Sequence, residues 1–227
     1  KHGLPATFFI ATGFLDGGRM WNDTIIESIR KCPMPVLDLE KLQMGWHEVA
    51  NPEQKRSAIE NLIRRIKYLS VAERLDRANK TAEAAQIQPP NDLMMTSAQV
   101  QQLRNAGMQI GAHTVSHPIL ARTDIKTARN EIISSKNMLE ALLGENIDIF
   151  AYPNGNPGID YSVEHPPLVR ELGFSAAVST TWGVADIASD VFQLPRFTPW
   201  GRTRMKFAMQ MARNFIRIGT DEKSRKL

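Results

Sequence analysis

From about residue 97 onward, the hydrophobic positions alternate between a helical period and short continuous runs. The helical stretches each end close to a glycine, and they cover 97–105, 124–143 (with Thr123 as the predicted cap) and 168–172. The short apolar runs are typical of buried strands, and they cover 6–11, 108–112, 147–151 and 174–178. This alternation predicts parallel βαβ units in an open sheet or a barrel.

Between about residues 16 and 90 the pattern is polar and helical instead. Apolar positions spaced by three and four predict helices over 21–29 and 52–69. Ser70 and Glu73 form a capping-box pattern that opens a further helix toward Ala85. Because strand-like runs are scarce here, we expect a helical insertion within the α/β pattern.

The composition is that of an ordinary globular domain, with 42% hydrophobic and 23% charged residues in 227. No apolar run approaches the roughly 18 residues of a membrane span, so none is predicted. The single cysteine, Cys32, excludes an internal disulfide and a cysteine-based zinc cage. Basic residues gather at 56–77 and 213–226, but neither cluster offers the basic stripe interleaved with exposed aromatic residues that nucleic-acid binding needs, so we expect no nucleic-acid partner. The oligomeric state is not predicted.

Two histidines follow the strand predicted at 108–112. His113 and His117 are separated by three residues and could bind one metal ion if the segment makes a helical turn. Imidazole suits zinc, iron, nickel or cobalt. The alternative is that one histidine packs or caps while the other faces solvent. Because functional groups of parallel α/β folds collect after the strands, the position favours the metal site.

Two other segments also follow predicted strands. The loop from Tyr152 to Tyr161 is rich in turn residues, and its backbone N–H groups could face a developing oxyanion. Either tyrosine could stack on a sugar ring, although a plain surface loop is the alternative. Farther along, Trp182 or Trp200 could line a carbohydrate groove or belong to the core, and Arg196 lies between them.

The segment Gly-Ala-His-Thr-Val-Ser-His-Pro after a strand resembles the second motif of the NodB-type polysaccharide deacetylases, carbohydrate esterase family 4. Residues 4–10 are similar to the strand that follows the first motif of that family, and residues 150–155 stand where its third motif is expected. The resemblance implies a distorted (β/α) barrel and hydrolysis of N-acetyl groups on a glycan. It also implies a divalent metal, usually zinc, held by His113 and His117.

The resemblance further implies that the third-motif loop, made of Tyr152, Pro153, Asn154 and Gly155, holds the oxyanion through the N–H of Asn154. In the family's first motif, Thr-Phe-Asp-Asp-Gly, lie the general base and the third metal ligand, and no Asp-Asp pair occurs in this chain. Gly3 and Pro5 are typical of a helix end, so we expect an N-terminally truncated domain whose base lies upstream of Lys1. A natural pseudoenzyme is the alternative.

Two more departures concern the catalytic groups. Ala151 stands where the family has an arginine that orients the base, and Arg196 is the candidate to replace it in space. The family's general acid is a histidine, and none of the remaining histidines has a matching context, so the acid is unassigned. These 227 residues are therefore expected to bind metal weakly and not to deacetylate, whereas a protein with the opening motif restored is expected to be active.

We expect a deacetylase domain at 1–215, with its insertion at 16–90, followed by a basic tail at 216–227. A non-catalytic glycan-binding module on the same fold is the main alternative. A metal-dependent hydrolase of another class is the second, and it would need a carboxylate such as Asp124, Asp160 or Asp186 to join the two histidines. The resemblance suggests a location in the cell envelope or outside the cell, and a cytoplasmic location stays open.

Overall fold

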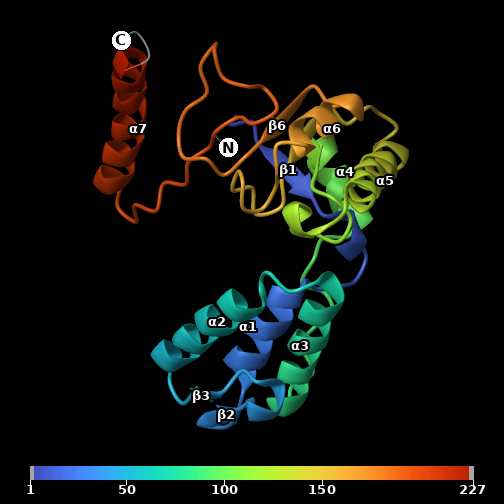
Figure 1. Ribbon diagram of the computed structural model, residues 1–227, viewed down its shortest axis with the longest axis vertical. Coiled ribbons are helices and arrows are strands. Elements are labelled where there is room, and N and C mark those ends of the chain that lie inside the picture. Colours follow the sequence, from blue (N-terminus) through green and yellow to red (C-terminus); the bar gives the residue numbers. More distant parts are fainter. Residues whose placement is uncertain (1–2, 225–227) are drawn as a thin grey trace. The chain divides into compact units, whose positions relative to one another are not determined.

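The computed structural model describes the backbone of residues 3–224 and the side chains of residues 3–214 (Figure 1). The chain divides into two compact units. The first unit joins the residues up to Thr12 with those from Gly107 onward, and the second unit is formed by residues 13–106. We refer to them as the sheet unit and the inserted unit.

The sheet unit contains a parallel sheet of β1 (Thr7–Ile10), β4 (Gln109–Ala112), β5 (Ile149–Ala151) and β6 (Ala176–Val178). The strands lie in the order β1-β4-β5-β6, with Phe8 opposite Ile110 and Phe150 opposite Ala177. The helical elements of this unit are η3 (Leu120–Arg122), α5 (Ile125–Leu143), α6 (His165–Glu171) and α7 (Arg204–Ser224). The predicted parallel α/β architecture is confirmed, and closure into a barrel stays a prediction.

Helix α5 shows how the glycine and cap signals set the ends of the helices. It ends at Gly144, which has a left-handed φ of 68°. It begins after Asp124, whose carboxylate accepts a hydrogen bond from the N–H of Thr127 at 2.9 Å. The prediction of Thr123 as the cap was wrong, because the Thr123 hydroxyl donates to the carbonyl of Leu120 instead. The aspartate alone is positioned to satisfy the first turn.

The inserted unit contains mainly helices. These are α1 (Trp21–Lys31), α2 (Pro52–Ile66), α3 (Val71–Ala84) and α4 (Ser97–Asn105), with η1 (Thr12–Phe14) at its boundary and η2 (Glu40–Leu42) within it. The unit has a hydrophobic core of its own, which includes Ile25, Ile29, Leu37, Leu62 and Ile66. Ser70 and Glu73 form the expected capping box of α3. This core explains why residues 13–106, although mostly polar, form a compact unit.

An antiparallel hairpin is the part of the inserted unit that the helical prediction missed. Strands β2 (Val36–Asp38) and β3 (Trp46–Glu48) pair with Leu37 opposite His47. Leu37 and His47 are buried and the residues on either side of each are exposed, which is the alternation of a strand with one face on a core. Three-residue strands are too short to give a clear periodic signal in the sequence.

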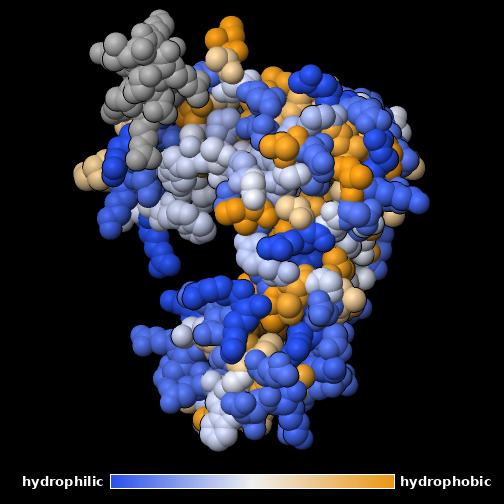
Figure 2. Space-filling model, viewed as in Figure 1, coloured by the Kyte–Doolittle hydropathy of each residue, from blue (hydrophilic) through white to orange (hydrophobic). Residues whose placement is uncertain are grey.

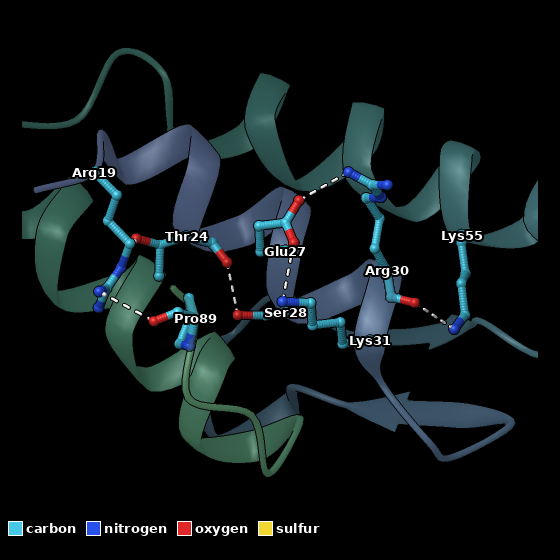
Figure 3. Close-up of polar contacts among 8 residues, drawn as sticks. All are labelled: Arg19, Thr24, Glu27, Ser28, Arg30, Lys31, Lys55 and Pro89. Carbon is cyan, nitrogen blue, oxygen red and sulfur yellow. Dashed lines mark hydrogen bonds and ion pairs between the residues drawn. The ribbon is translucent and has the colours of Figure 1, made fainter. Parts of the chain in front are cut away.

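Polar contacts fix the end of α1 against α2 (Figure 3). The Nζ of Lys55 donates to the carbonyl oxygens of Arg30 and Cys32 at 2.9 and 3.0 Å. Glu27 pairs with Arg30 and Lys31 within α1. The last carbonyls of a helix have no partner within the helix, so Lys55 supplies the donors that the end of α1 needs.

The two segments that lead into and out of the inserted unit are bonded to each other. The N–H of Asp16 donates to the carbonyl of Met95 at 3.2 Å. The carboxylate of Asp16 accepts from the N–H of Ser97 at 2.7 Å and from its hydroxyl. Gly18 and Asp92 form a parallel bridge. We call these contacts the clasp, because they close the insertion on itself.

The surface seen in Figure 2 carries many hydrophilic residues. Among the described residues, no helix is both long and apolar enough to cross a membrane.

Helix α7 runs to Ser224 and so includes much of the tail predicted at 216–227, while residues 225–227 lie outside the described residues. Gly3 has the left-handed φ of 63° expected at a helix end, and the residues before it are also outside the described ones.

Candidate functional site

The carboxyl ends of the four parallel strands bring together the segments singled out in the sequence. Thr12 closely follows β1, His113 follows β4, Tyr152 follows β5 and Ser179 follows β6. Parallel strands place these ends along one edge of the sheet. The backbone confirms this, since the N–H of Thr12 donates to the carbonyl of Thr114 and the N–H of Tyr152 donates to Val178.

His113 and His117 lie side by side, with ring centroids 4.7 Å apart and ring planes at 70°. The segment between them does not make the helical turn that their spacing suggested. Thr114 and His117 instead adopt left-handed conformations, with φ of 64° and 54°. The buried Thr114 hydroxyl accepts the N–H of His117 at 3.1 Å and donates to the carbonyl of His113. Non-glycine residues rarely adopt this conformation, so the loop is locally strained and held by its contacts.

The environment of His113 favours a neutral imidazole. Burial lowers its pKa to about 4, the carbonyl of Ala151 opposes this shift, and the positive charge of Arg196 lowers the pKa further. The Nδ1 atom lies 2.7 Å from the Ala151 oxygen. A neutral ring at this distance donates its Nδ1 proton to the carbonyl, which leaves the lone pair on Nε2. This is the arrangement that orients a metal-binding histidine.

Glu131, on α5, holds the histidine loop, and sequence reasoning did not find it. Its Oε2 accepts from the N–H of Val115 at 2.9 Å and from the N–H of Ser116 at 2.8 Å. Its Oε1 accepts from the Ser116 hydroxyl at 2.7 Å. A glutamate within a long amphipathic helix has the pattern of a solvent-facing residue, so the sequence carries no signal for this role.

The two tyrosines after β5 are core residues, so the expectation that one of them stacks on a sugar was wrong. Tyr152 and Tyr161 are 0% and 1% exposed, and their rings stack on each other with centroids 3.9 Å apart. The Tyr152 hydroxyl donates to the carbonyl of Phe192 at 2.9 Å. Burial raises the pKa of both hydroxyls, that of Tyr161 to about 12. Large rings that follow a buried strand are used here to fill the core.

The backbone of the same loop turns sharply after Pro153. Asn154 and Gly155 have left-handed φ values of 59° and 74°. The N–H of Gly155 donates to Pro153 at 2.7 Å, and the Asn154 carbonyl accepts from the Thr180 hydroxyl at 2.9 Å. Within the described part of the chain, the N–H of Asn154 has no hydrogen-bond acceptor. This is the donor that the resemblance assigned to an oxyanion.

Arg196 and Trp182 have different surroundings. The Arg196 side chain is exposed, its pKa is lowered by partial desolvation, and its charge acts on His113. Trp182 is 48% exposed and lines a hollow of about 200 Å³ with residues of α7, including Gln210. Its ring packs against Phe197, with centroids 5.9 Å apart. Arg196 therefore belongs to the surroundings of the histidine pair, whereas Trp182 belongs to the hollow beside α7.

None of the three candidate carboxylates joins the histidine pair. Asp124 caps α5, Asp160 accepts from the N–H of Asn156, and Asp186 accepts from the N–H of Ala188. Among residues 3–214, whose side chains the structure describes, no cluster of three or more His, Cys, Asp or Glu side chains could hold a metal ion. The described residues thus contribute two imidazoles, and the arrangement required by a different metal-dependent hydrolase is not found.

A family model described as polysaccharide deacetylase matches residues 1–177. No curated protein matches the chain. Solved structures that match include a deacetylase, PplD, from Streptococcus pyogenes, solved with acetate, at 28% identity and a TM-score of 0.43. Another is IcaB from Ammonifex degensii, at 19% identity and a TM-score of 0.42. A third is the putative polysaccharide deacetylase BA0330 from Bacillus anthracis, at 17% identity and a TM-score of 0.44. The matches to PplD, IcaB and BA0330 cover 48%, 52% and 51% of this chain, respectively. They cover only 45%, 52% and 36% of the lengths of those three chains.

Proposed function

Because the chain belongs to the polysaccharide deacetylase family, we propose that it forms the metal-binding and oxyanion-binding parts of a metal-dependent hydrolase that removes N-acetyl groups from a polysaccharide. The observation that carries the proposal is the pair of imidazoles 4.7 Å apart at the carboxyl end of β4. Their position within the matched residues 1–177 supports the same assignment.

His113 and His117 are the residues that would hold the metal, and zinc is the ion we propose. The donor set fits, since imidazole nitrogens are preferred zinc ligands and His113 is uncharged at neutral pH. The Ala151 carbonyl fixes the Nδ1–H tautomer, so the lone pair of Nε2 would be the one that binds the ion. A bound divalent ion polarises a carbonyl and lowers the pKa of a water molecule.

The chain's own backbone and side chains would orient the substrate and stabilise its charge. The N–H of Asn154 would donate to the acetamide oxygen as that oxygen gains negative charge. Arg196 adds a positive charge close to His113. Glu131 keeps the histidine loop in its strained conformation. Neither the general base nor the third ligand has been found among the described residues.

Metal binding is tested by titrating zinc into the metal-free 227-residue chain in a calorimeter. We expect weak binding, because two protein ligands are fewer than the three or four of usual zinc sites. His113→Ala and His117→Ala should each abolish it. Asp186→Ala is the matched control, because that carboxylate serves its own loop. Binding that survives both histidine variants would overturn the metal assignment.

Acetate release from N-acetylglucosamine oligomers tests the reaction. A protein that carries the family's Asp-Asp motif together with these 227 residues is expected to release acetate, and His113→Ala to abolish the release. The 227-residue chain alone is expected to release none, because it has no Asp-Asp pair. Should the chain alone prove active in a His113-dependent manner, the base lies within it. Oligomer binding without any acetate release by the protein that carries the Asp-Asp motif would favour a non-catalytic glycan-binding module.

A further inference from the structure

A tryptophan of the inserted unit is exposed at the edge of a small polar hollow. Trp46, on β3, is 69% exposed, although tryptophan is usually well buried. It lines a hollow of about 240 Å³ together with Glu48 of the same strand and with Gln54, Ser57 and Asn61 of α2. The hollow lies wholly within the inserted unit, and none of the residues discussed for the histidine site contributes to it.

The hairpin presents this tryptophan by its alternation. His47 is buried and its Nε2 lies 3.0 Å from the carbonyl of Met44, so Trp46 and Glu48 face outward. Arg65 of α2 also hydrogen-bonds to the Met44 carbonyl, which fixes the turn just before Trp46. The backbone that carries Trp46 is therefore fixed, and most of the side chain is exposed.

The other wall of the hollow is an uncharged strip on an otherwise charged helix. Gln54, Ser57 and Asn61 are spaced by three and four residues, so they lie on one face of α2. The outer face of α2 carries charges instead, at Glu53, Arg56, Glu60 and Arg64. Gln54 bridges to Glu48 at 2.8 Å. No hydrogen bond ties the side chain of Ser57 or Asn61 to another residue in the described ranges, so both are available to a ligand.

These groups match the chemistry of a sugar residue. A pyranose has an apolar face that packs on an aromatic ring and a rim of hydroxyl and acetamido groups. Amide, hydroxyl and carboxylate side chains pair with that rim as donors and acceptors. A protein partner would require a larger apolar surface, and between residues 36 and 66 only Val36 and Trp46 are large, apolar and exposed.

We propose that this hollow is an accessory sugar-binding site, in which one residue of an N-acetylated glycan stacks on Trp46 and hydrogen-bonds to Ser57, Asn61 and Glu48. The choice of an N-acetylated glycan rests on the proposed function, whereas the recognition of a sugar rests on the hollow itself. The site gives the inserted unit a role in retaining polymer, separate from the histidine pair.

The test is a titration of the 227-residue chain with the N-acetylglucosamine tetramer. Binding is monitored through the indole N–H signals of the four tryptophans in an NMR spectrum. The Trp46 signal, identified with Trp46→Phe, is expected to shift saturably. Trp46→Ala should weaken binding by about tenfold or more. Trp200→Ala is the matched control, because that residue is 79% exposed and lines none of the hollows described above.

Two further measurements distinguish sugar binding at Trp46 from a general loss of folding and from binding at the histidine pair. Trp46→Ala should leave the thermal unfolding midpoint unchanged, because the side chain is mostly exposed. The combined His113→Ala and His117→Ala chain should bind the tetramer with unchanged affinity, so failure of the metal site and failure of this site are distinguishable. Absence of saturable binding, or equal affinity in Trp46→Ala, would overturn the proposal.

Discussion

Replacing Glu131 with glutamine is the sharpest test of how the histidine loop is held. The carboxylate accepts three hydrogen bonds from Val115 and Ser116, at 2.7 to 2.9 Å. Glutamine keeps one acceptor oxygen but replaces the other with an NH₂ group, which is a donor and cannot accept from the N–H or hydroxyl groups of the loop. Hydrogen bonds to a charged group contribute about 1.5–3 kcal/mol and neutral ones about 1 kcal/mol. We therefore expect Glu131→Gln to reduce the local stability of the loop by about 2–3 kcal/mol.

Amide hydrogen exchange measures this loss directly at the bonds concerned. The Val115 and Ser116 amides should exchange about 30- to 150-fold faster, which corresponds to about 2–3 kcal/mol. Zinc affinity should fall by about tenfold or more, because the loop positions His117. Glu164→Gln is the matched control, since that residue is exposed and makes no side-chain cap bond at the start of α6. Unchanged exchange in a folded Glu131→Gln chain would refute the reasoning.

Three other changes have defined outcomes. The His113 pKa lies near 4 in the folded chain and near 6.5 when unfolded, so the unfolded state binds the proton first as pH falls. The free energy of unfolding of the metal-free chain should therefore fall by up to roughly 3 kcal/mol as the pH is lowered from about 6.5 to 4. In urea unfolding, His113→Gln should not show this pH-dependent loss. Gly111→Ala places a Cβ 2.6 Å from the Phe9 ring, so the unfolding free energy measured in urea should fall by about 1–3 kcal/mol, and an unchanged value would contradict that packing. Arg74 is 2% exposed without a carboxylate partner in the described ranges. Arg74→Met should therefore preserve or raise the unfolding free energy, and a loss above about 1 kcal/mol would contradict this.

The parts of the fold that the sequence predicted depend on local signals. Glycines such as Gly144 end helices through their own backbone freedom, and the run 108–112 forms the expected strand, with its residues 110–112 buried. The position of His113 and His117 after a strand was likewise readable from the sequence, although the helical turn that was expected to bring them together does not form. Their conformation was not, because it depends on hydrogen bonds within a strained loop.

The parts that could not be predicted depend on residues distant in the chain. The partner of His113, the Ala151 carbonyl, is 38 positions away, and the Arg196 charge comes from a still later segment. Glu131 reaches the loop from a helix that the periodicity alone describes as an ordinary amphipathic one. The burial of Tyr152 follows from its stacking on Tyr161, which depends on how the loop folds back.

The clasp has a consequence for the order of folding. Strands β1 and β4 are neighbours, and their side-chain bond from Thr7 to Gln109 spans 102 positions. Closing a loop of that length costs chain entropy before any contact compensates, and such pairings form slowly. Once Asp16 is bonded to Met95 and Ser97, most of that length is already closed. Prior folding of the inserted unit therefore shortens the loop that remains to be closed. A chain that lacks the Asp16 carboxylate should pair β1 with β4 more slowly.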